Sequence, residues 1–324
     1  NGTFRDHYIE VPFDLSQVLF ITTANSLDTV SRPLLDRMEI IELSGYTSNE
    51  KFHIAKDYLV KKSMKNNGLD DNDLTISDDA VEAVIEYYTR EAGVRKLEQQ
   101  IGKICRKAVK KLLENTERPI EITKQNLEEY LGKERFHFEK MNEQDEIGVA
   151  RGLAWTSVGG DTLSIEVNVM PGSGKVELTG KLGDVMKESA MAAISYIRAN
   201  SQKLGIAENF HKTKDIHIHV PEGAVPKDGP SAGITMATAV VSALTKNPVR
   251  NDIAMTGEIT LRGRVLPIGG LKEKSLAAFR AGITDIIIPN ENKADIDDVP
   301  KEVRSKINFI PVKSMDTVLE NALR

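Results

Sequence analysis

Cysteine is almost absent from this chain of 324 residues, in which Cys105 is the single example. One cysteine allows no internal disulfide, and this scarcity fits a reducing compartment. Cys105 lies on an apolar stripe with Ile101, Ile104 and Ala108 at helical spacing. We therefore expect a core residue there and not a thiol nucleophile.

Long apolar runs and an excess of positive charge are also missing. No stretch approaches the roughly 18–20 apolar residues of a membrane-spanning helix, so we expect no membrane partner. The net charge of −5 argues against DNA as the main partner. A basic patch at residues 106–111 keeps DNA binding as an alternative. The remaining composition, 40% hydrophobic and 28% charged, is typical of a globular chain with roughly two domains.

The most informative segment that is present is PKDGPSAG, residues 226–233. Asp228, Gly229 and Pro230 form a turn signal, and the uncharged residues 232–244 predict a buried helix that Asp228 can cap. Ser231 then lies at or next to a helix N-terminus, where free backbone N–H groups can stabilise an oxyanion. Ser231 as a simple helix cap and this N-terminus as a phosphate site are the alternatives from the local pattern.

A second segment supplies a candidate base. Residues 271–281 predict a helix that ends at Gly282. Lys274 falls among alanines on this helix, and Lys272 falls between Leu276 and Phe279, so periodicity leaves open which lysine is inside. A lysine in a dry site loses stabilisation of its charge and can then act as a general base for serine.

Histidine offers a competing chemistry. His217 and His219 share one face of a predicted strand at residues 215–220 and could chelate a metal in a metallohydrolase. A zinc site needs three or four ligands, and no third ligand is evident, so we predict no metal site. A binding module that grips an anion near Ser231 and cleaves nothing is the other alternative.

Four segments together resemble the proteolytic domain of the Lon family of ATP-dependent proteases. They read HIHVPEGA (217–224), PKDGPSAG (226–233), TGEITLRG (256–263) and GGLKEK (269–274). The resemblance implies that Ser231 is the nucleophile and Lys274 its base, with Thr256 as a hydrogen-bond partner near the lysine. It also implies that Asp228 can pair with Lys274 in an inactive arrangement and that Glu166 is an acidic residue near the site. Backbone N–H groups of Ser231 and Ala232 are expected to form the oxyanion hole.

The resemblance extends to AAA+ ATPase elements upstream. A predicted apolar strand at residues 18–23 delivers Asn25, which the resemblance makes a sensor of the γ-phosphate. Arg37 follows Pro33-Leu34-Leu35-Asp36 and matches the arginine finger that reaches a neighbouring subunit's nucleotide. Arg95 in REAGVR (90–95) matches the second sensor.

The resemblance also implies parts that the chain does not contain. It has no Gly-x-x-x-x-Gly-Lys-Ser/Thr loop and no strand ending in paired acidic residues. We therefore expect a C-terminal portion of the family's chain that does not hydrolyse ATP alone. ATP and Mg²⁺ would be bound mainly by residues that are absent here.

The expected organisation is multidomain. Residues 1–43 are the remnant of the AAA+ α/β domain, residues 44–140 an all-α lid domain, residues 141–146 a linker and residues 147–324 an α+β proteolytic domain. In the lid we expect helices capped near Ser48, at 77–89, at 94–114 and at 124–131, with a short strand at 120–122. In the proteolytic domain we expect β-hairpins over 152–181, a helix at 184–200, and strands near 215–220, 253–256 and 285–288.

The predicted function is that of an ATP-dependent serine endopeptidase that degrades unfolded, damaged or regulatory proteins. By resemblance, its partners are those substrates and further copies of the chain in a homohexameric ring. The expected location is the bacterial cytoplasm.

Overall fold

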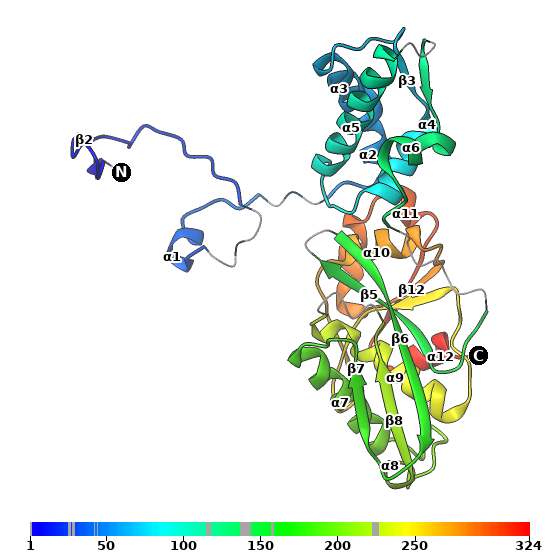
Figure 1. The fold of residues 1–324 in the computed structure, drawn as a ribbon. Helices are drawn as coiled ribbons and strands as arrows, with labels where there is room; N and C mark the ends of the chain where they lie inside the picture. The colour runs from blue at the N-terminus through cyan, green and yellow to red at the C-terminus, as the bar shows by residue number, and fades with distance from the viewer. Residues whose placement is uncertain are drawn as a thin grey trace. The chain divides into compact units, whose positions relative to one another are not determined.

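The computed structural model describes residues 2–24, 27, 30–41, 43, 45–114, 118–136, 144–156, 159–221 and 227–324 (Figure 1). These residues fall into two units, residues 1–44 and residues 45–324. In the described part of the chain, no helix is both long and apolar enough to span a membrane.

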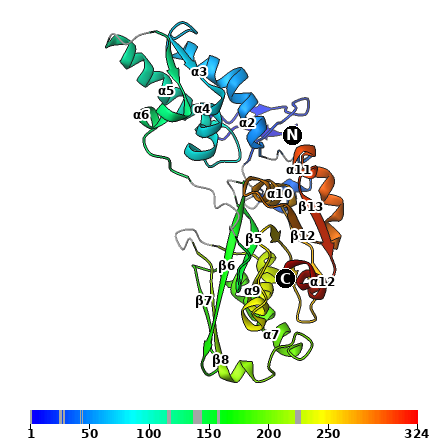
Figure 2. The same cartoon turned by 90° about the vertical axis from the view of Figure 1, so that its right-hand side faces the viewer.

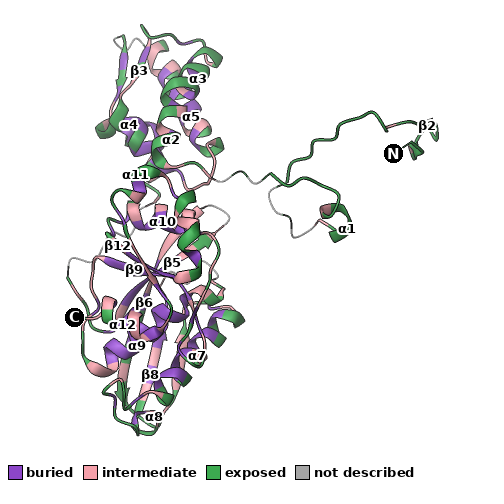
Figure 3. Cartoon of the chain, turned by 180° about the vertical axis from the view of Figure 1, so that it is seen from behind, coloured by how far each residue is buried: buried purple, intermediate pink, exposed green. Residues whose placement is uncertain are grey.

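The first unit contains little regular structure. A short antiparallel ladder joins β1 (Phe4–Arg5) to β2 (Pro12–Phe13), and α1 spans Arg32–Leu35. The strand predicted over residues 18–23 does not form, so that prediction was wrong. A strand needs a neighbour for its backbone N–H and C=O groups, and no described strand pairs with this segment. Its residues are exposed, Leu19 and Ile21 among them. The extended trace that follows the N-terminus is accordingly green in Figure 3.

The lid begins with three consecutive helical segments. Thr47 and Glu50 form a reciprocal capping box, so the cap is one residue earlier than the predicted Ser48. The remaining lid elements match their predicted positions, and the long helix buries its apolar stripe, including Cys105. In order, the lid helices are α2 (Ser48–Ile54), η1 (Ala55–Leu59), α3 (Val60–Asn66), α4 (Asp78–Ala83), η2 (Val84–Tyr88), α5 (Arg95–Leu113), η3 (Lys124–Asn126) and α6 (Leu127–Leu131).

The lid is not purely helical, which corrects the all-α prediction. The expected strand β4 (Ile120–Ile122) finds a parallel partner in β3 (Leu74–Ile76). Both strands alternate apolar residues inward, with Leu74 and Ile122 fully buried in the lid core. Three residues of β3 are too few for periodicity to distinguish a strand from a loop.

The proteolytic part is built on one mixed sheet of seven strands, in the order β13-β12-β9-β5-β6-β8-β7. The strands are β5 (Val149–Thr156), β6 (Gly159–Pro171), β7 (Val176–Thr179), β8 (Lys214–His219), β9 (Ile253–Met255), β12 (Asp285–Pro289) and β13 (Asn308–Val312). A separate small ladder joins β10 (Glu258–Ile259) to β11 (Val265–Leu266). The helices are α7 (Asp184–Ala199), α8 (Phe210–Thr213), η4 (Pro230–Ala232), α9 (Gly233–Thr245), α10 (Leu271–Arg280), η5 (Asn290–Asp298), α11 (Lys301–Arg304) and α12 (Met315–Ala322).

One strand pairing differs from the predicted hairpins. β5 and β6 form the expected antiparallel hairpin, but β6 does not pair with β7 because β8 lies between them. The Asp215 carboxylate of β8 accepts hydrogen bonds from the N–H groups of Ser173, Gly174 and Lys175, which fixes the turn before β7 beside β8. Alternation predicted the strands correctly, but it carries no information on which strand becomes the spatial neighbour.

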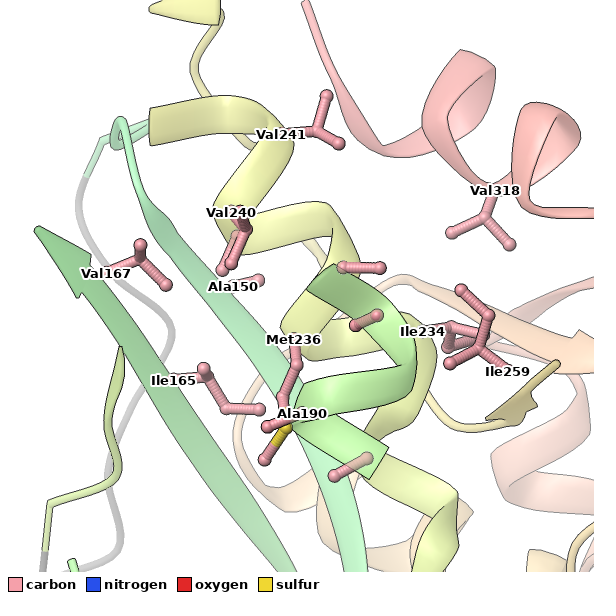
Figure 4. Close-up of a cluster of buried hydrophobic side chains, with 14 of the residues drawn as sticks. Ala150, Ile165, Val167, Ala190, Ile234, Met236, Val240, Val241, Ile259 and Val318 are labelled. Carbon is pink, nitrogen blue, oxygen red and sulfur yellow. The ribbon is translucent and has the colours of Figure 1, made fainter. Parts of the chain in front are cut away.

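Two helical layers cover the sheet. Figure 2 shows α7 and α9 gathered on one side of β6 and β8. In that layer Ile165, Met236 and Ala190 lie together between β6, α9 and α7 (Figure 4). A separate core joins α10 to the sheet, where Leu271 and Ala278 meet Leu153 and Ile286. The sheet is thus enclosed by α9 and α10, the two helices that carry the candidate site.

Candidate active site

Ser231 lies on a tight turn that leads directly into α9. Gly229 adopts φ 133° and ψ 151°, a conformation that side-chain-bearing residues rarely adopt. Pro230 then opens the 3₁₀ turn η4, and α9 follows at Gly233. The predicted position of Ser231 beside a helix N-terminus is therefore confirmed, as is the burial of the uncharged helix behind it.

Asp228 does not cap this helix, and that prediction was wrong. Its carboxylate accepts a hydrogen bond of 3.0 Å from the N–H of Met186, in the first turn of α7. The same oxygen accepts from the N–H of Gly229. A Cβ atom at Gly183 would clash with this carboxylate, so the glycine before α7 makes room for it. Asp228 is thus a long-range cap for α7, which no local sequence pattern can indicate.

Lys274 is buried in the first turns of α10, with only 3% of its surface exposed. Its Nζ atom donates a hydrogen bond of 3.0 Å to Oγ1 of Thr256, which is itself fully buried. Burial lowers the pKa of the Lys274 amine to about 8. At pH 7 roughly a tenth of this amine is then neutral, far more than for an ordinary lysine, and a general base must be neutral.

The structure distinguishes the two lysines that periodicity could not separate. Lys272 is half-buried, whereas Lys274 is buried. Asp228 is hydrogen-bonded to α7, so the inactive Asp228–Lys274 pairing is not the arrangement seen here.

Thr256 and Gly257 join the serine segment to the lysine. The N–H of Thr256 donates to the carbonyl of Ile287 on β12, which fixes this residue at the carboxyl end of β9. The N–H of Gly257 donates to the Ser231 carbonyl at 2.9 Å, and the Gly257 carbonyl accepts from the N–H of Ile234 at 3.2 Å. The side chain of Thr256 holds Lys274 while the next residue holds the backbone of Ser231. The bridging role of Gly257 was not predicted, because backbone hydrogen bonds between distant segments leave no sequence pattern.

Glu166 is exposed on β6. It pairs with Val149 and His219 in the sheet. Glu166 is an outward-facing strand residue.

The histidine pair is explained by a local hydrogen-bond arrangement. The Thr179 hydroxyl contacts Nε2 of His217 at 2.9 Å and Nδ1 of His219 at 2.7 Å. Among the described residues, no group of three or more histidine, cysteine or acidic side chains could hold a metal ion. The geometry gives the metallohydrolase alternative no support.

The three expected nucleotide-contacting residues lie in different parts of the chain. Asn25 falls outside the described residues. Arg37 is exposed directly after α1, and Arg95 is exposed at the first position of α5. Both guanidinium groups are accessible, as contact with a nucleotide would require.

Ser231, Lys274 and Thr256 are linked through the backbone of residues 256–257 and the Lys274–Thr256 hydrogen bond. A serine at a helix entry, a buried lysine with a lowered pKa and a threonine that fixes that lysine are the parts of a Ser–Lys variant of the serine hydrolase arrangement.

Comparison with known proteins agrees with this class. Residues 121–324 match the family model of the Lon protease (S16) C-terminal proteolytic domain, and residues 65–120 match that of the Lon protease AAA+ ATPase lid domain. The chain is 60% identical over 324 residues to the Lon protease of Clostridioides difficile and 58% identical over 323 residues to Lon protease 1 of Bacillus subtilis. All of this chain is covered in both matches, against 41% and 42% of those relatives.

The chain belongs to the Lon protease family. It spans about two-fifths of the length of the relatives it matches. The match to the proteolytic domain begins at residue 121, although β4 and α6 bury their apolar side chains in the lid core.

Proposed function

We propose that this chain carries the proteolytic site of an ATP-dependent serine endopeptidase, with Ser231 as nucleophile and Lys274 as base. The observation that carries the proposal is the buried Lys274 amine, held by Thr256 and lowered in pKa to about 8. Membership of the Lon protease family supports the same reaction.

The proposed reaction proceeds in two stages. Neutral Lys274 takes the proton from the Ser231 hydroxyl as the serine oxygen attacks the peptide carbonyl. The resulting oxyanion accepts hydrogen bonds from the backbone N–H groups of Ser231 and Ala232 at the helix entry. Lys274 then gives its proton to the leaving amine, which leaves an acyl-enzyme. Water hydrolyses this ester with Lys274 again as base.

Thr256 has a positioning role in this scheme. Its hydroxyl accepts the hydrogen bond from Lys274 Nζ, which holds the free end of this long, flexible side chain in place. Its own hydrogen can be donated elsewhere, so it serves the amine in both protonation states.

The nucleotide-dependent part of the function rests on residues outside this site. We assign residues 1–43 to the end of an AAA+ α/β domain, with Asn25 and Arg37 as nucleotide contacts and Arg95 as a contact from the lid. ATP and Mg²⁺ would be held mainly by a phosphate-binding loop and paired acids that this sequence does not contain. No chemical step at Ser231 uses either group.

The proposed substrates are unfolded, damaged or regulatory proteins, and the proposed assembly is a homohexameric ring in the bacterial cytoplasm. A finger arginine such as Arg37 acts across a subunit boundary, which is why the proposal includes further copies of the chain.

Single substitutions at the two catalytic positions test the proposal. We expect Ser231→Ala and Lys274→Ala each to abolish cleavage of a fluorogenic peptide and of an unfolded protein. Lys272→Ala is the matched control on the same helix and should retain cleavage. Circular dichroism checks that each variant is folded. Full activity in either folded catalytic variant would refute the dyad.

A further inference from the structure

An ion pair links the lid to the proteolytic part of the second unit. Arg90 follows η2 in the lid, and its guanidinium pairs with the carboxylate of Asp161 at the start of β6. About a third of the Arg90 side chain and a quarter of the Asp161 side chain are exposed, so the pair is partly shielded from solvent.

On the lid side, the segment that carries Arg90 is held on two sides. The carboxylate of the next residue, Glu91, accepts hydrogen bonds from the N–H groups of Lys96 and Leu97 at 2.9 and 2.8 Å. It therefore caps α5, the helix that begins with Arg95. The buried amine of Lys51 on α2 donates to the Glu91 carbonyl. The segment of Arg90 is thus hydrogen-bonded to two lid helices, α2 and α5.

On the proteolytic side, the partner of Arg90 adjoins the helix of the catalytic lysine. Gly160 precedes Asp161 and packs directly against the backbone of Glu273 and Lys274. A Cβ atom at Gly160 would clash with the Glu273 carbonyl and lie 3.0 Å from the Lys274 nitrogen. At the other end of α10, Arg280 donates to the Gly160 carbonyl at 2.9 Å. A displacement of Gly160 would therefore displace α10.

The contact between the lid and the proteolytic part is polar. Among the described residues, the lid core and the two cores of the proteolytic part are separate, and none contains buried residues from both sides. A cavity of about 390 Å³ lies at this contact, lined by Arg90, Asp161 and Gly160 together with lid residues that include Lys51. Apolar packing does not hold the lid against the proteolytic part at this contact. Specific polar pairs such as Arg90–Asp161 therefore contribute more to its position.

We propose that Arg90 and Asp161 are positioning residues for the proteolytic site: the lid holds the start of β6 against α10 through this pair and so fixes the placement of Lys274. The inference rests on the proposed role of Lys274. It makes the lid a structural support of the catalytic lysine, without contact between either residue and substrate.

The single tryptophan provides a direct reporter. Trp155 on β5 packs against Gly270, the residue before α10, where a Cβ atom would lie 3.1 Å from the Trp155 side chain. Trp155 lies on the same hairpin as Asp161, opposite Gly160 in the register. A shift between the hairpin and α10 should change its fluorescence emission.

The test compares Arg90→Ala and Asp161→Asn with Arg90→Lys, which keeps a positive charge toward Asp161, all in this chain. Arg324→Ala is the matched control, because it breaks an ion pair with Asp145, a carboxylate as exposed as Asp161. We expect Arg90→Ala and Asp161→Asn each to lower kcat for a fluorogenic peptide at least about fivefold with little change in KM, and to shift Trp155 emission. Arg90→Lys should retain much of both, and Arg324→Ala should change neither.

Several outcomes overturn the proposal. Wild-type kcat and emission in a folded Arg90→Ala variant would show that the pair does not position α10. A folded Arg90→Lys variant as impaired as Arg90→Ala would show that the charge pairing with Asp161 is not what matters. The emission readout is also taken in a Ser231→Ala background, where no cleavage is needed. If the wild-type chain cleaves nothing, the catalytic proposal fails, while the emission result still decides the positioning role.

Discussion

Lys274 and Thr256 form a buried pair at the centre of the candidate site. The Nζ atom of Lys274 donates to the threonine hydroxyl at 3.0 Å, and both residues are almost completely excluded from solvent. They come from different elements: Thr256 follows β9, an interior strand of the sheet, and Lys274 belongs to α10. Burial in this position destabilises the charged form of the lysine. The amine is then more readily neutral, as a base for serine must be.

Burial of Lys274 should weaken the fold, and its removal should strengthen it. Burial lowers the pKa of this amine from 10.5 to about 8, so below pH 8 the native state holds a charge that the unfolded chain holds more easily. The cost is fully present below pH 8 and disappears as pH rises through 10.5. We expect Lys274→Met to raise the free energy of unfolding at pH 7 by up to about 3 kcal/mol.

Urea denaturation at pH 7 measures this effect, with the half-buried Lys272→Met as control. The control should be near neutral. A folded Lys274→Met variant that is clearly less stable than wild type would show that burial of the Lys274 charge does not destabilise the fold.

The Thr256 hydroxyl should matter more to activity than to folding. Thr256→Val keeps the size of the side chain but removes the acceptor for Lys274 Nζ. We expect roughly a tenfold loss of kcat for peptide cleavage, as expected for one lost hydrogen bond of about 1.4 kcal/mol. Thr256→Ser keeps the hydroxyl and should recover most of the rate. Equal rates in the valine and serine variants would show that the hydrogen bond has no part in catalysis.

Asp228 should behave as a helix cap and not as a partner of the catalytic lysine. Its carboxylate accepts from the N–H of Met186 at the start of α7. We expect Asp228→Ala to lower the free energy of unfolding by about 1 kcal/mol, the usual cost of losing such a cap. Asp228→Asn keeps an acceptor oxygen and should leave the pH midpoint of peptide cleavage unchanged. A lower midpoint in the asparagine variant would instead indicate an Asp228–Lys274 ion pair.

Chelation separates the serine peptidase from the metal alternative. We expect a chelator to leave peptide cleavage by this chain unchanged, since the rings of His217 and His219 are hydrogen-bonded to Thr179. A double His217→Gln and His219→Gln variant should keep the activity as well. Loss of activity with the chelator, reversed by added zinc, would favour the metallohydrolase.

The helices of the site were predictable because their signals are local. The uncharged run after Ser231 became the buried helix α9, and the turn before Leu271 opened α10. The 3.6-residue and two-residue periods mark such elements whatever they pack against. Local signals also placed most lid helices and the strands of the proteolytic part.

What the sequence did not predict depends on distant contacts. β8 lies between β6 and β7. The Asp215 carboxylate of β8 fixes this order by accepting backbone hydrogen bonds from a turn about forty residues earlier. The choice between Lys272 and Lys274 needed the burial that only the folded sheet provides, and the family resemblance made that choice before the structure did. The apolar residues 18–23 carried a genuine strand pattern, but a strand forms only beside another strand.

The pH dependence of peptide cleavage tests the central claim most directly. If Lys274 is the base for Ser231, kcat should rise with pH through a midpoint of about 8 in the wild type, as the buried amine loses its proton. Lys272→Met should show the same midpoint, and Lys274→Met should show no cleavage at any pH. A midpoint of about 8 that persists in an active Lys274→Met variant would contradict the account.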